Sequence, residues 1–503
     1  MHMSFILPQE RRFLSAVSKL AYCNPFLPER TEYEQSALGR DYVASEAVWS
    51  ASVEEPDANS PNVARLHARL EPLIEKLRLR LTEKPEVTAE DLVLYEECVH
   101  HLLYQRYYRE FVNATSDWRF YERFAADLSR YFADGPERFA TAREPEHVFA
   151  CFRQIQRAFH LIFDHIIGNS MPAARLRASV WQSVFSYDLR RYRRILYSRM
   201  PDFPTLITGE SGTGKELVAR AIAGSRYLRF DAARLRFDEP AHESFIPINV
   251  AALPSELIES ELFGHLRGSF TGAIKDRQGW LDVCPPAGSV FLDEVGEMQL
   301  SVQVKLLRVI ETRKFSAVGD TKERVFHGKL MAATNRDLRA EIRGGRFRED
   351  LYYRLCADLI RTPSLRQQIE DSPEVLDDLI LFMVKRAVKD EAERCFPEVK
   401  SWIDEHLPPG YGWPGNYREL EQCVRNVIIR RSYQPMNNVV EWTEDHFYDR
   451  FRRGELTMDE LIGYYASLVY QKTGSYEETA RVVGLDRRTV KAKVESFLKR
   501  AVN

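Results

Sequence analysis

The sequence predicts an α/β core between an all-α N-terminal region and an all-α C-terminal region. Through most of the first 180 residues, apolar side chains recur every three or four positions, as at Leu66, Leu70 and Leu73, which is the spacing of helices with one buried face. From about position 181, short apolar runs alternate with helix-like stretches, a pattern typical of a parallel sheet covered by helices. The end of the chain returns to helical spacing.

Composition and charge narrow the class of protein. The 503 residues are 44% hydrophobic and 29% charged, which is typical of folded chains rather than disordered ones. Lys and Arg total 71 against 74 Asp and Glu, so any contact with DNA must come from a local basic patch. The seven cysteines form no CxxC pair, and no stretch reaches the roughly 18 apolar residues of a membrane span. We therefore expect a cytoplasmic protein with no membrane segment.

The changes in pattern predict four parts. Residues 1–180 are expected to form a helical regulatory or sensor domain of unknown ligand, and residues 181–364 an α/β subdomain. A helical lid is expected over 365–440 and a helical DNA-binding unit over 456–503. The expected strands of the core are Thr205–Thr208, Phe245–Val250, Ser289–Leu292 and Lys329–Ala333, and two of its expected helices are Glu216–Ala223 and Val302–Thr312.

A glycine-rich loop, GESGTGK, separates the first expected strand from a helix. Its glycines let backbone N–H groups converge on phosphate oxygens, the helix N-terminus adds partial positive charge, and Lys215 can reach the β- and γ-phosphates. Glu216 stands where a Ser or Thr normally helps to hold Mg²⁺, so metal binding must rest on another residue. The expected nucleotide-binding residues are Gly209, Glu210, Ser211, Gly212, Thr213, Gly214, Lys215 and Glu216.

Polar residues at the ends of two later apolar runs complete a predicted ATP site. Asp293 follows Ser289–Leu292 and suits Mg²⁺ coordination, while the adjacent Glu294 suits polarising the attacking water. Asn335 ends the run from Lys329 and is placed to sense the γ-phosphate. In this order along the chain, the motifs predict ATP hydrolysis with Mg²⁺ as cofactor.

At this point the motifs resemble a known family, the AAA+ activators of sigma-54 RNA polymerase, also called bacterial enhancer-binding proteins. The resemblance runs from about Leu206 to Leu420. It implies an AAA+ core that hydrolyses ATP in a ring, expected to be a hexamer. The segments that carry it are GESGTGKE (209–216), FLDEVGEM (291–298), ATNRDL (333–338), FREDLYYRL (347–355) and WPGNYREL (413–420), which are similar to Walker A, Walker B, the first sensor, the arginine-finger segment and the second sensor.

Several catalytic roles follow from the resemblance. It implies that Asn249 restrains Glu294 as a switch and that Arg418 contacts nucleotide from the lid. It also implies that Arg348 and Arg354 act as arginine fingers across a subunit boundary, although three arginines in this segment could equally form a solvated helix face.

The segment ESELFGHLRGSFTGA (259–273) resembles the family's signature insertion, with its GAFTGA loop that contacts sigma-54. Flanking glycines permit a tight, mobile tip, and Phe270 offers apolar surface to a partner, although a lone Phe can also pack into its own core. Ser269 replaces the family's Ala, and the extra residues at about 225–244 are expected to form a surface loop. The expected sigma-54 contacts are Gly268, Ser269, Phe270, Thr271, Gly272 and Ala273.

The C-terminal region predicts helices separated by a turn at Gly484, with Asp486 capping the last helix. Residues 481–503 contain seven basic and two acidic side chains, which gives the local basic patch that DNA contact requires. The segment resembles the Fis-type helix-turn-helix found in these activators, although a short basic helix can also be a solvated surface. The expected DNA contacts are Arg487, Arg488, Thr489, Lys491 and Lys493.

The first third leaves its ligand open. His147 and Cys151 lie four residues apart, and Cys98 lies near two histidines, so a metal or haem sensor is conceivable, although His and Cys without ligand roles are commoner. Two aromatic clusters could line a small-molecule pocket, form an interface with a regulatory protein or simply be core. The clusters are Tyr104, Tyr107, Tyr108 and Phe111, and Trp118, Phe120, Tyr121 and Phe124.

The sequence as a whole therefore predicts a sigma-54-dependent transcription activator. Its expected partners are sigma-54 RNA polymerase, double-stranded enhancer DNA and further copies of itself. Two alternatives remain. One is an AAA+ DNA-binding regulator that acts without sigma-54, and the other is a protein remodeller whose tail only holds a partner.

Overall fold

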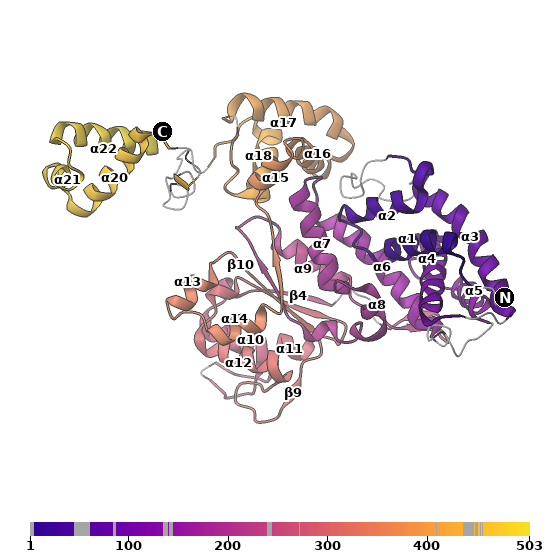
Figure 1. Cartoon of the computed structure of the whole chain (residues 1–503). Helices are drawn as coiled ribbons and strands as arrows, with labels where there is room; N and C mark the ends of the chain where they lie inside the picture. Colours follow the sequence, from indigo (N-terminus) through magenta and orange to yellow (C-terminus); the bar gives the residue numbers. More distant parts are fainter. Residues whose placement is uncertain are drawn as a thin grey trace. The chain divides into compact units, whose positions relative to one another are not determined.

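The computed structural model describes residues 5–44, 61–83, 87–133, 139, 144–238, 244–270, 272–408, 410–435, 447, 451–452, 454 and 456–502. The chain divides into two compact units, Met1–Arg425 and Asn426–Asn503 (Figure 1). Within the ranges given above, no helix is both long and apolar enough to cross a membrane.

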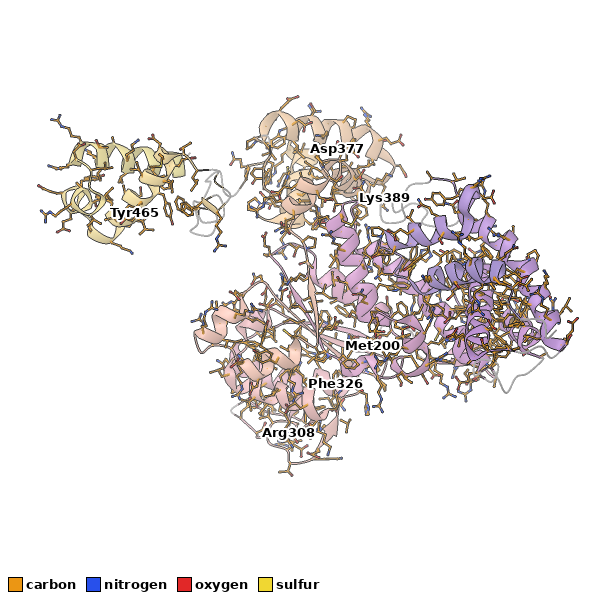
Figure 2. All side chains as sticks on the ribbon, in the orientation of Figure 1. Met200, Arg308, Phe326, Asp377, Lys389 and Tyr465 are labelled. Atoms are coloured by element: carbon orange, nitrogen blue, oxygen red, sulfur yellow. The ribbon has the colours of Figure 1, made fainter. Side chains whose placement is uncertain are left out.

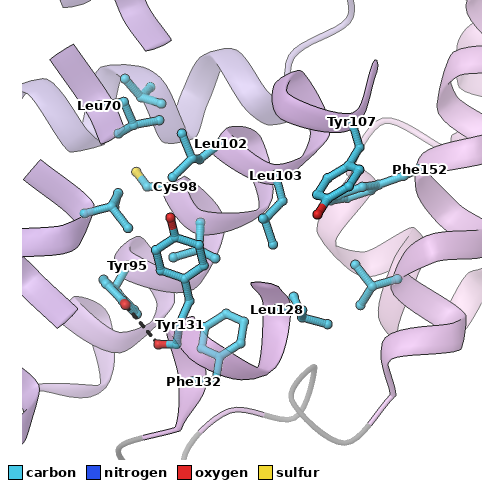
Figure 3. Packing of buried hydrophobic residues seen from close by; sticks show 14 of the residues in the cluster. Leu70, Tyr95, Cys98, Leu102, Leu103, Tyr107, Leu128, Tyr131, Phe132 and Phe152 are labelled. Carbon is cyan, nitrogen blue, oxygen red and sulfur yellow. Dashed lines mark hydrogen bonds between the residues drawn. The ribbon is translucent and has the colours of Figure 1, made fainter. Parts of the chain in front are cut away.

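Helices precede the sheet in the first unit, as the sequence predicts. No strand occurs among the described residues before Thr205. Buried aromatic side chains fill the space between these helices, and the hydroxyl of Tyr95 donates to the carbonyl oxygen of Tyr131 at 2.9 Å (Figure 3). The main helices are α1 (Pro8–Tyr22), α2 (Glu29–Leu38), α3 (Pro61–Thr82), α4 (Ala89–Asn113), α5 (Tyr121–Phe132), α6 (Pro145–His165) and α7 (Met171–Phe185).

A five-stranded parallel sheet follows, in the order β11-β1-β10-β7-β4. The four expected strands are confirmed, and the fifth, at the edge, was not expected. Because β1, β10 and β7 are neighbours, the loops after them meet at one edge of the sheet. The strands are β1 (Thr205–Thr208), β4 (Phe245–Asn249), β7 (Ser289–Asp293), β10 (Lys329–Thr334) and β11 (Asp358–Arg361).

Alternate side chains of the strands enter two separate cores. Ile207 and Met331 face the side on which α6, α7 and α9 pack. Leu206 and Leu292 face the opposite side, with the remaining helices of the subdomain. The sheet therefore has helices on both faces, which confirms the predicted α/β architecture (Figure 1). The helices named here for the first time are α9 (Lys215–Gly224), α10 (Ser255–Phe263), α12 (Leu300–Thr312), α13 (Leu338–Arg343) and α14 (Glu349–Leu355).

The extra residues after α9 form an antiparallel hairpin of β2 (Phe230–Asp231) and β3 (Arg236–Phe237). Sequence analysis expected a surface loop here, and the structure differs. The ring of Phe230 is fully buried against Phe149 of α6, with ring centroids 4.6 Å apart. Phe237 meets Trp118 edge-on at 4.9 Å. The two phenylalanines join the N-terminal aromatic core because their alternative is exposure to water.

Helices also form the end of the first unit and the second unit. The first group covers the glycine loop and is called the lid here. In the second unit, Ala466, Val490 and Val494 form a small core, and Tyr465 stands exposed on α20 (Figure 2). The lid helices are α15 (Leu365–Asp371), α16 (Val375–Val388), α17 (Ala392–His406) and α18 (Asn416–Arg430), and the C-terminal helices are α20 (Met458–Thr473), α21 (Tyr476–Val483) and α22 (Arg487–Val502).

Candidate nucleotide site and partner loop

The glycine loop joins β1 to α9 through backbone that glycine adopts most readily. Gly212 and Gly214 have φ of 79° and 86°, in the left-handed region. A Cβ atom on Gly212 would lie 2.3 Å from the carbonyl oxygen of Gly415 in the lid. Glycine at this position therefore lets the lid backbone lie directly against the loop.

Lys215 begins α9 at the end of this loop and is largely buried. Its Nζ donates to the carbonyl oxygens of Gly209 and Glu210, both at 3.0 Å. Burial lowers the pKa of Lys215, and the nearby carboxylates of Glu294 and Asp293 oppose that shift. An anion bound in the loop would stabilise the ammonium further, which is the role expected of a phosphate.

Asp293 ends β7 beside Glu294, whose backbone N–H donates to the Asp293 Oδ1 at 3.0 Å. Burial raises the pKa of Asp293, and the negative charge of Glu294 adds to the shift. A half-buried carboxylate with a neighbouring carboxylate is stabilised by a divalent cation. These residues therefore fit Mg²⁺, with Asp293 as its protein ligand.

Two asparagines were expected to act on this pair. The backbone N–H of Asn335 donates to Glu294 Oε2 at 3.2 Å, so the end of β10 orients Glu294. Asn249 lies opposite Asp293 in the sheet, and its Oδ1 accepts from the N–H of Ala252 at 3.1 Å. Among the described residues, no hydrogen bond joins Asn249 to Glu294, and its role as a switch stays a prediction.

A cavity of about 600 Å³ opens between the glycine loop, the end of β7 and the lid. This volume lies within the range of ordinary ligand clefts. Residues 211–216, Asn249, Asp293 and Glu294 line it together with Arg418 of the lid. The Nη1 of Arg418 donates to Ser211 Oγ at 3.3 Å. The structure thus brings most of the expected nucleotide residues to one cavity.

Sequence reasoning missed Asn416, which is fully buried at the start of α18. Its Nδ2 donates to Glu210 Oε2 at 3.1 Å and to the Ser211 carbonyl oxygen at 3.0 Å. Its Oδ1 accepts from the backbone N–H of Leu365 at 2.8 Å. One side chain therefore joins the glycine loop, the first lid helix and the last.

A second missed group lies far upstream. His165, Ile166 and Ile167 at the end of α6, with Leu176 of α7, line the apolar end of the same cavity. These residues lie inside the range assigned to the regulatory domain. Their spacing could have shown a helix, but nothing in it pointed to a nucleotide.

The expected arginine fingers lie outside this cavity. Arg348 makes a two-point ion pair with Asp350, its shorter N–O distance being 2.6 Å, and Arg354 pairs with Glu311 at 3.0 Å. Both side chains are exposed. They are therefore placed on the surface, away from the nucleotide cavity of their own chain.

The loop expected to contact sigma-54 lies between β5 (Gly264–His265) and β6 (Arg277–Gln278). The N–H of Gly268 donates to the Ala273 carbonyl oxygen at 2.9 Å, which closes a tight tip. Gly268 and Gly272 have φ of 82° and 103°, so the tip requires both glycines. Thr271 lies outside the described residues.

Phe270 and Ser269 differ in exposure. The Phe270 side chain is 36% exposed, with its edge 5.0 Å from the ring of His265, and so is not part of the core. The hydroxyl of Ser269 is buried and has no hydrogen-bond partner among the described residues. A family alanine at 269 would avoid this unsatisfied group.

The C-terminal unit places the expected DNA residues on the first turns of α22. Asp486 Oδ1 accepts from the N–H groups of Arg488 and Thr489, both at 3.0 Å, which confirms the predicted N-cap. Lys493 pairs with Asp459 of α20 at 2.6 Å. The side chains of Arg487, Arg488 and Lys491 are exposed.

The structure gives no support to a metal or haem centre in the first third. Both ring nitrogens of His147 have partners, namely the Tyr227 hydroxyl and the Arg193 carbonyl oxygen, each at 2.8 Å. Within the part of the chain that is described, no group of three or more His, Cys, Asp or Glu side chains could hold a metal ion.

Comparison with solved structures adds one similarity. NtrX from Brucella abortus, solved in complex with ATP, matches with a TM-score of 0.39 and 24% identity, over 71% of this chain and 76% of that one. At this TM-score the similarity supports no conclusion about this chain.

Known sequences match the core more closely. Regulatory protein LuxO of Vibrio cholerae is 44% identical over 238 residues, which are 47% of this chain and 48% of LuxO. The Nif-specific regulatory protein of Azotobacter vinelandii is 42% identical over 239 residues, 47% of this chain and 42% of its own length. The chain thus spans about half the length of these relatives. Residues 187–361, which include the sheet, the glycine loop and the 268–273 tip, match the sigma-54 interaction domain.

Proposed function

We propose that the chain is an ATP-driven transcription activator that remodels sigma-54 RNA polymerase and promotes open-complex formation. The observation that carries this proposal is the occurrence, in one domain, of a nucleotide cavity and a glycine-flanked loop with an accessible phenylalanine. The match of that domain to the sigma-54 interaction domain supports the choice of partner.

The chemistry assigned to the cavity follows from its charges. Lys215 and the backbone of the glycine loop bind the phosphates, and Asp293 holds Mg²⁺. When bound, Mg²⁺ supplies charge neutralisation at the β- and γ-phosphates. Glu294, held by the Asn335 amide, polarises the water that attacks the γ-phosphate. Arg418 contacts the nucleotide from the lid.

The exposed fingers support action in a ring. Because Arg348 and Arg354 do not line the cavity of their own chain, they are free to enter that of a neighbour. A guanidinium donated in this way stabilises charge on the transferring phosphoryl group. We therefore assign the active form as a homo-oligomeric ring, most simply a hexamer.

DNA contact is assigned to the Fis-type helix-turn-helix proposed at the C-terminus. The exposed Arg487, Arg488 and Lys491 on α22 support it because they carry uncompensated positive charge at a capped helix start. The hydroxyl of Thr489 is bonded to Asp486, and Lys493 to Asp459, so these two require rearrangement to reach DNA.

The proposal is tested by transcription from a sigma-54 promoter with purified full-length protein. Wild type with ATP should give open complexes, and Phe270→Ala should abolish them while ATP turnover persists. Phe203→Ala, at another partly exposed phenylalanine outside the loop, is the matched control and should remain active. Open complexes without sigma-54, or equal activity of Phe270→Ala, would favour a regulator independent of sigma-54. Absence of sequence-selective footprints would favour a protein remodeller.

A further inference from the structure

A second cavity, of about 130 Å³, lies among the helices of the first unit. Its walls come from α1, α3, α4, α6 and α7 and from the turn Tyr192–Leu196 that precedes the sheet. A cavity of about 150 Å³ in another protein is large enough to hold benzene. The space here is therefore suited to a molecule about the size of one six-membered ring.

The wall of this cavity is mainly aromatic and apolar. Phe152, Phe159, Trp181 and Phe185 contribute rings from α6 and α7, and Leu66 closes one side. Rings in such a wall favour edge-to-face contact with a further ring.

The structure also resolves the ambiguity of the first aromatic cluster. Tyr104 and Tyr108 line the cavity, whereas Tyr107 and Phe111 lie in the aromatic core (Figure 3 labels Tyr107). The other aromatic cluster is also core, because all four of its rings are buried there.

One polar side chain in the wall lacks a partner. Among the described residues, neither ring nitrogen of His101 makes a hydrogen bond. Burial lowers the pKa of His101 to about 4, with smaller effects from Arg30 and His67, so its imidazole is neutral at pH 7. The hydroxyl of Tyr22, another wall residue, is likewise buried without a partner. A neutral imidazole offers one donor and one acceptor to a ligand.

The charged groups of the wall are already compensated. Arg30 pairs with Glu34 at 3.2 Å, and Arg193 approaches Glu96 at 3.8 Å and bonds to His100. A charged ligand would therefore lose its hydration without gaining an unpaired counter-ion. This disfavours both carboxylates and amines.

We propose that this cavity is a binding site for a neutral, mostly apolar, ring-sized molecule whose single polar group hydrogen-bonds to His101. Size, wall chemistry and charge balance each point to the same class of ligand. The binding itself does not depend on the proposed function of the chain.

The site is connected to the helix that carries Lys215. The hydroxyl of Tyr192 donates to Gln154 Oε1 at 2.8 Å, and Gln154 Nε2 donates to the carbonyl oxygen of Ser225 at 2.8 Å. Ser225 directly follows α9. Phe159, Trp181 and Phe185 also share one hydrophobic cluster with β1 and α9. An effect of the ligand on ATP turnover rests on the proposed function, and we use binding as the test.

The test measures binding of benzene, phenol and benzoate to the full-length protein by saturation-transfer NMR and competition. Phenol should bind at millimolar concentration or better, about 5-fold more tightly than benzene because of one added hydrogen bond. Benzoate should not bind. His101→Leu should remove the preference for phenol and leave benzene binding in place.

Two variants fill the space from different sides. Ile155→Phe and Val63→Phe, both in the wall, should each abolish binding of phenol and benzene. Ile429→Phe, at a 76% exposed position on α18, is the matched control and should bind as wild type does. Circular dichroism checks that each variant folds, and either folded variant suffices. Failure of wild type to bind phenol and benzene, tight benzoate binding, or full binding by a folded filled variant would each overturn the proposal.

Discussion

Substitution of Asn416 is the most direct test of how the lid is attached to the glycine loop. Its side chain makes three hydrogen bonds, to Glu210, Ser211 and Leu365, and its backbone has a φ of 53°. Asn tolerates this left-handed conformation better than Ala does. Asn416→Ala therefore removes the bonds and adds backbone strain, whereas Asn416→Gly removes the bonds alone.

The expected magnitude follows from these contacts. Each buried hydrogen bond contributes about 1 kcal/mol net, which gives about 3 kcal/mol for the three. A left-handed Ala adds about 1 kcal/mol. At 1.4 kcal/mol per factor of ten, lid opening should become about 100-fold more favourable in Asn416→Gly and about 700-fold in Asn416→Ala.

Hydrogen exchange at Tyr417 reports this opening, because its backbone N–H donates to the Gly212 carbonyl oxygen at 3.1 Å. Exchange at Tyr417 should accelerate by these factors in both variants, and ATP affinity should fall with it. The amide of Leu292, in the middle of β7, is the internal reference and should keep its wild-type rate. Acceleration of less than about 5-fold in Asn416→Ala would refute the view that this side chain holds the lid on the loop.

Three further predictions concern other parts of the first unit. Asp293→Asn should abolish ATP turnover yet keep or raise the melting temperature without Mg²⁺, because the raised pKa of Asp293 shows that its charge is disfavoured in the folded state at pH 7; a lower melting temperature would contradict this. Ser269→Ala should slow hydrogen exchange in the 266–270 segment by about 5-fold, since it removes a buried unpaired hydroxyl, and faster exchange would argue against that cause. Phe230→Ala should destabilise the N-terminal helices by about 3 to 5 kcal/mol in denaturant unfolding, whereas Phe203→Ala should cost less than about 1 kcal/mol; equal effects would place the hairpin outside the core.

Local patterns explain why so much of the α/β core could be predicted. An apolar run such as Ser289–Leu292 reads as a buried strand, and the carboxylate after it marks the strand's end. The glycine loop carries its own signal because its φ angles demand glycine. The edge strand Asp358–Arg361 was missed because only its two central residues are apolar.

Contacts distant in sequence explain what could not be predicted. Asn416 bonds to residues more than 200 positions away, and no spacing rule connects them. Phe230 belongs to the core of helices that lie before it in the chain, so its segment looked like an ordinary insertion. Tyr104 and Tyr107 are three residues apart on α4, yet only Tyr104 lines the small cavity, since the fold alone decides which face meets it.

The central claim is that nucleotide in the cavity controls the grip of the 268–273 tip on sigma-54. Its most direct measurement is complex formation between the full-length protein and purified sigma-54, followed by native gel or size-exclusion chromatography with ADP and aluminium fluoride as a transition-state trap. The account predicts a complex that requires the trap and is lost in Phe270→Ala but kept in Phe203→Ala. A complex that forms without nucleotide, or one that Phe270→Ala retains, would contradict it.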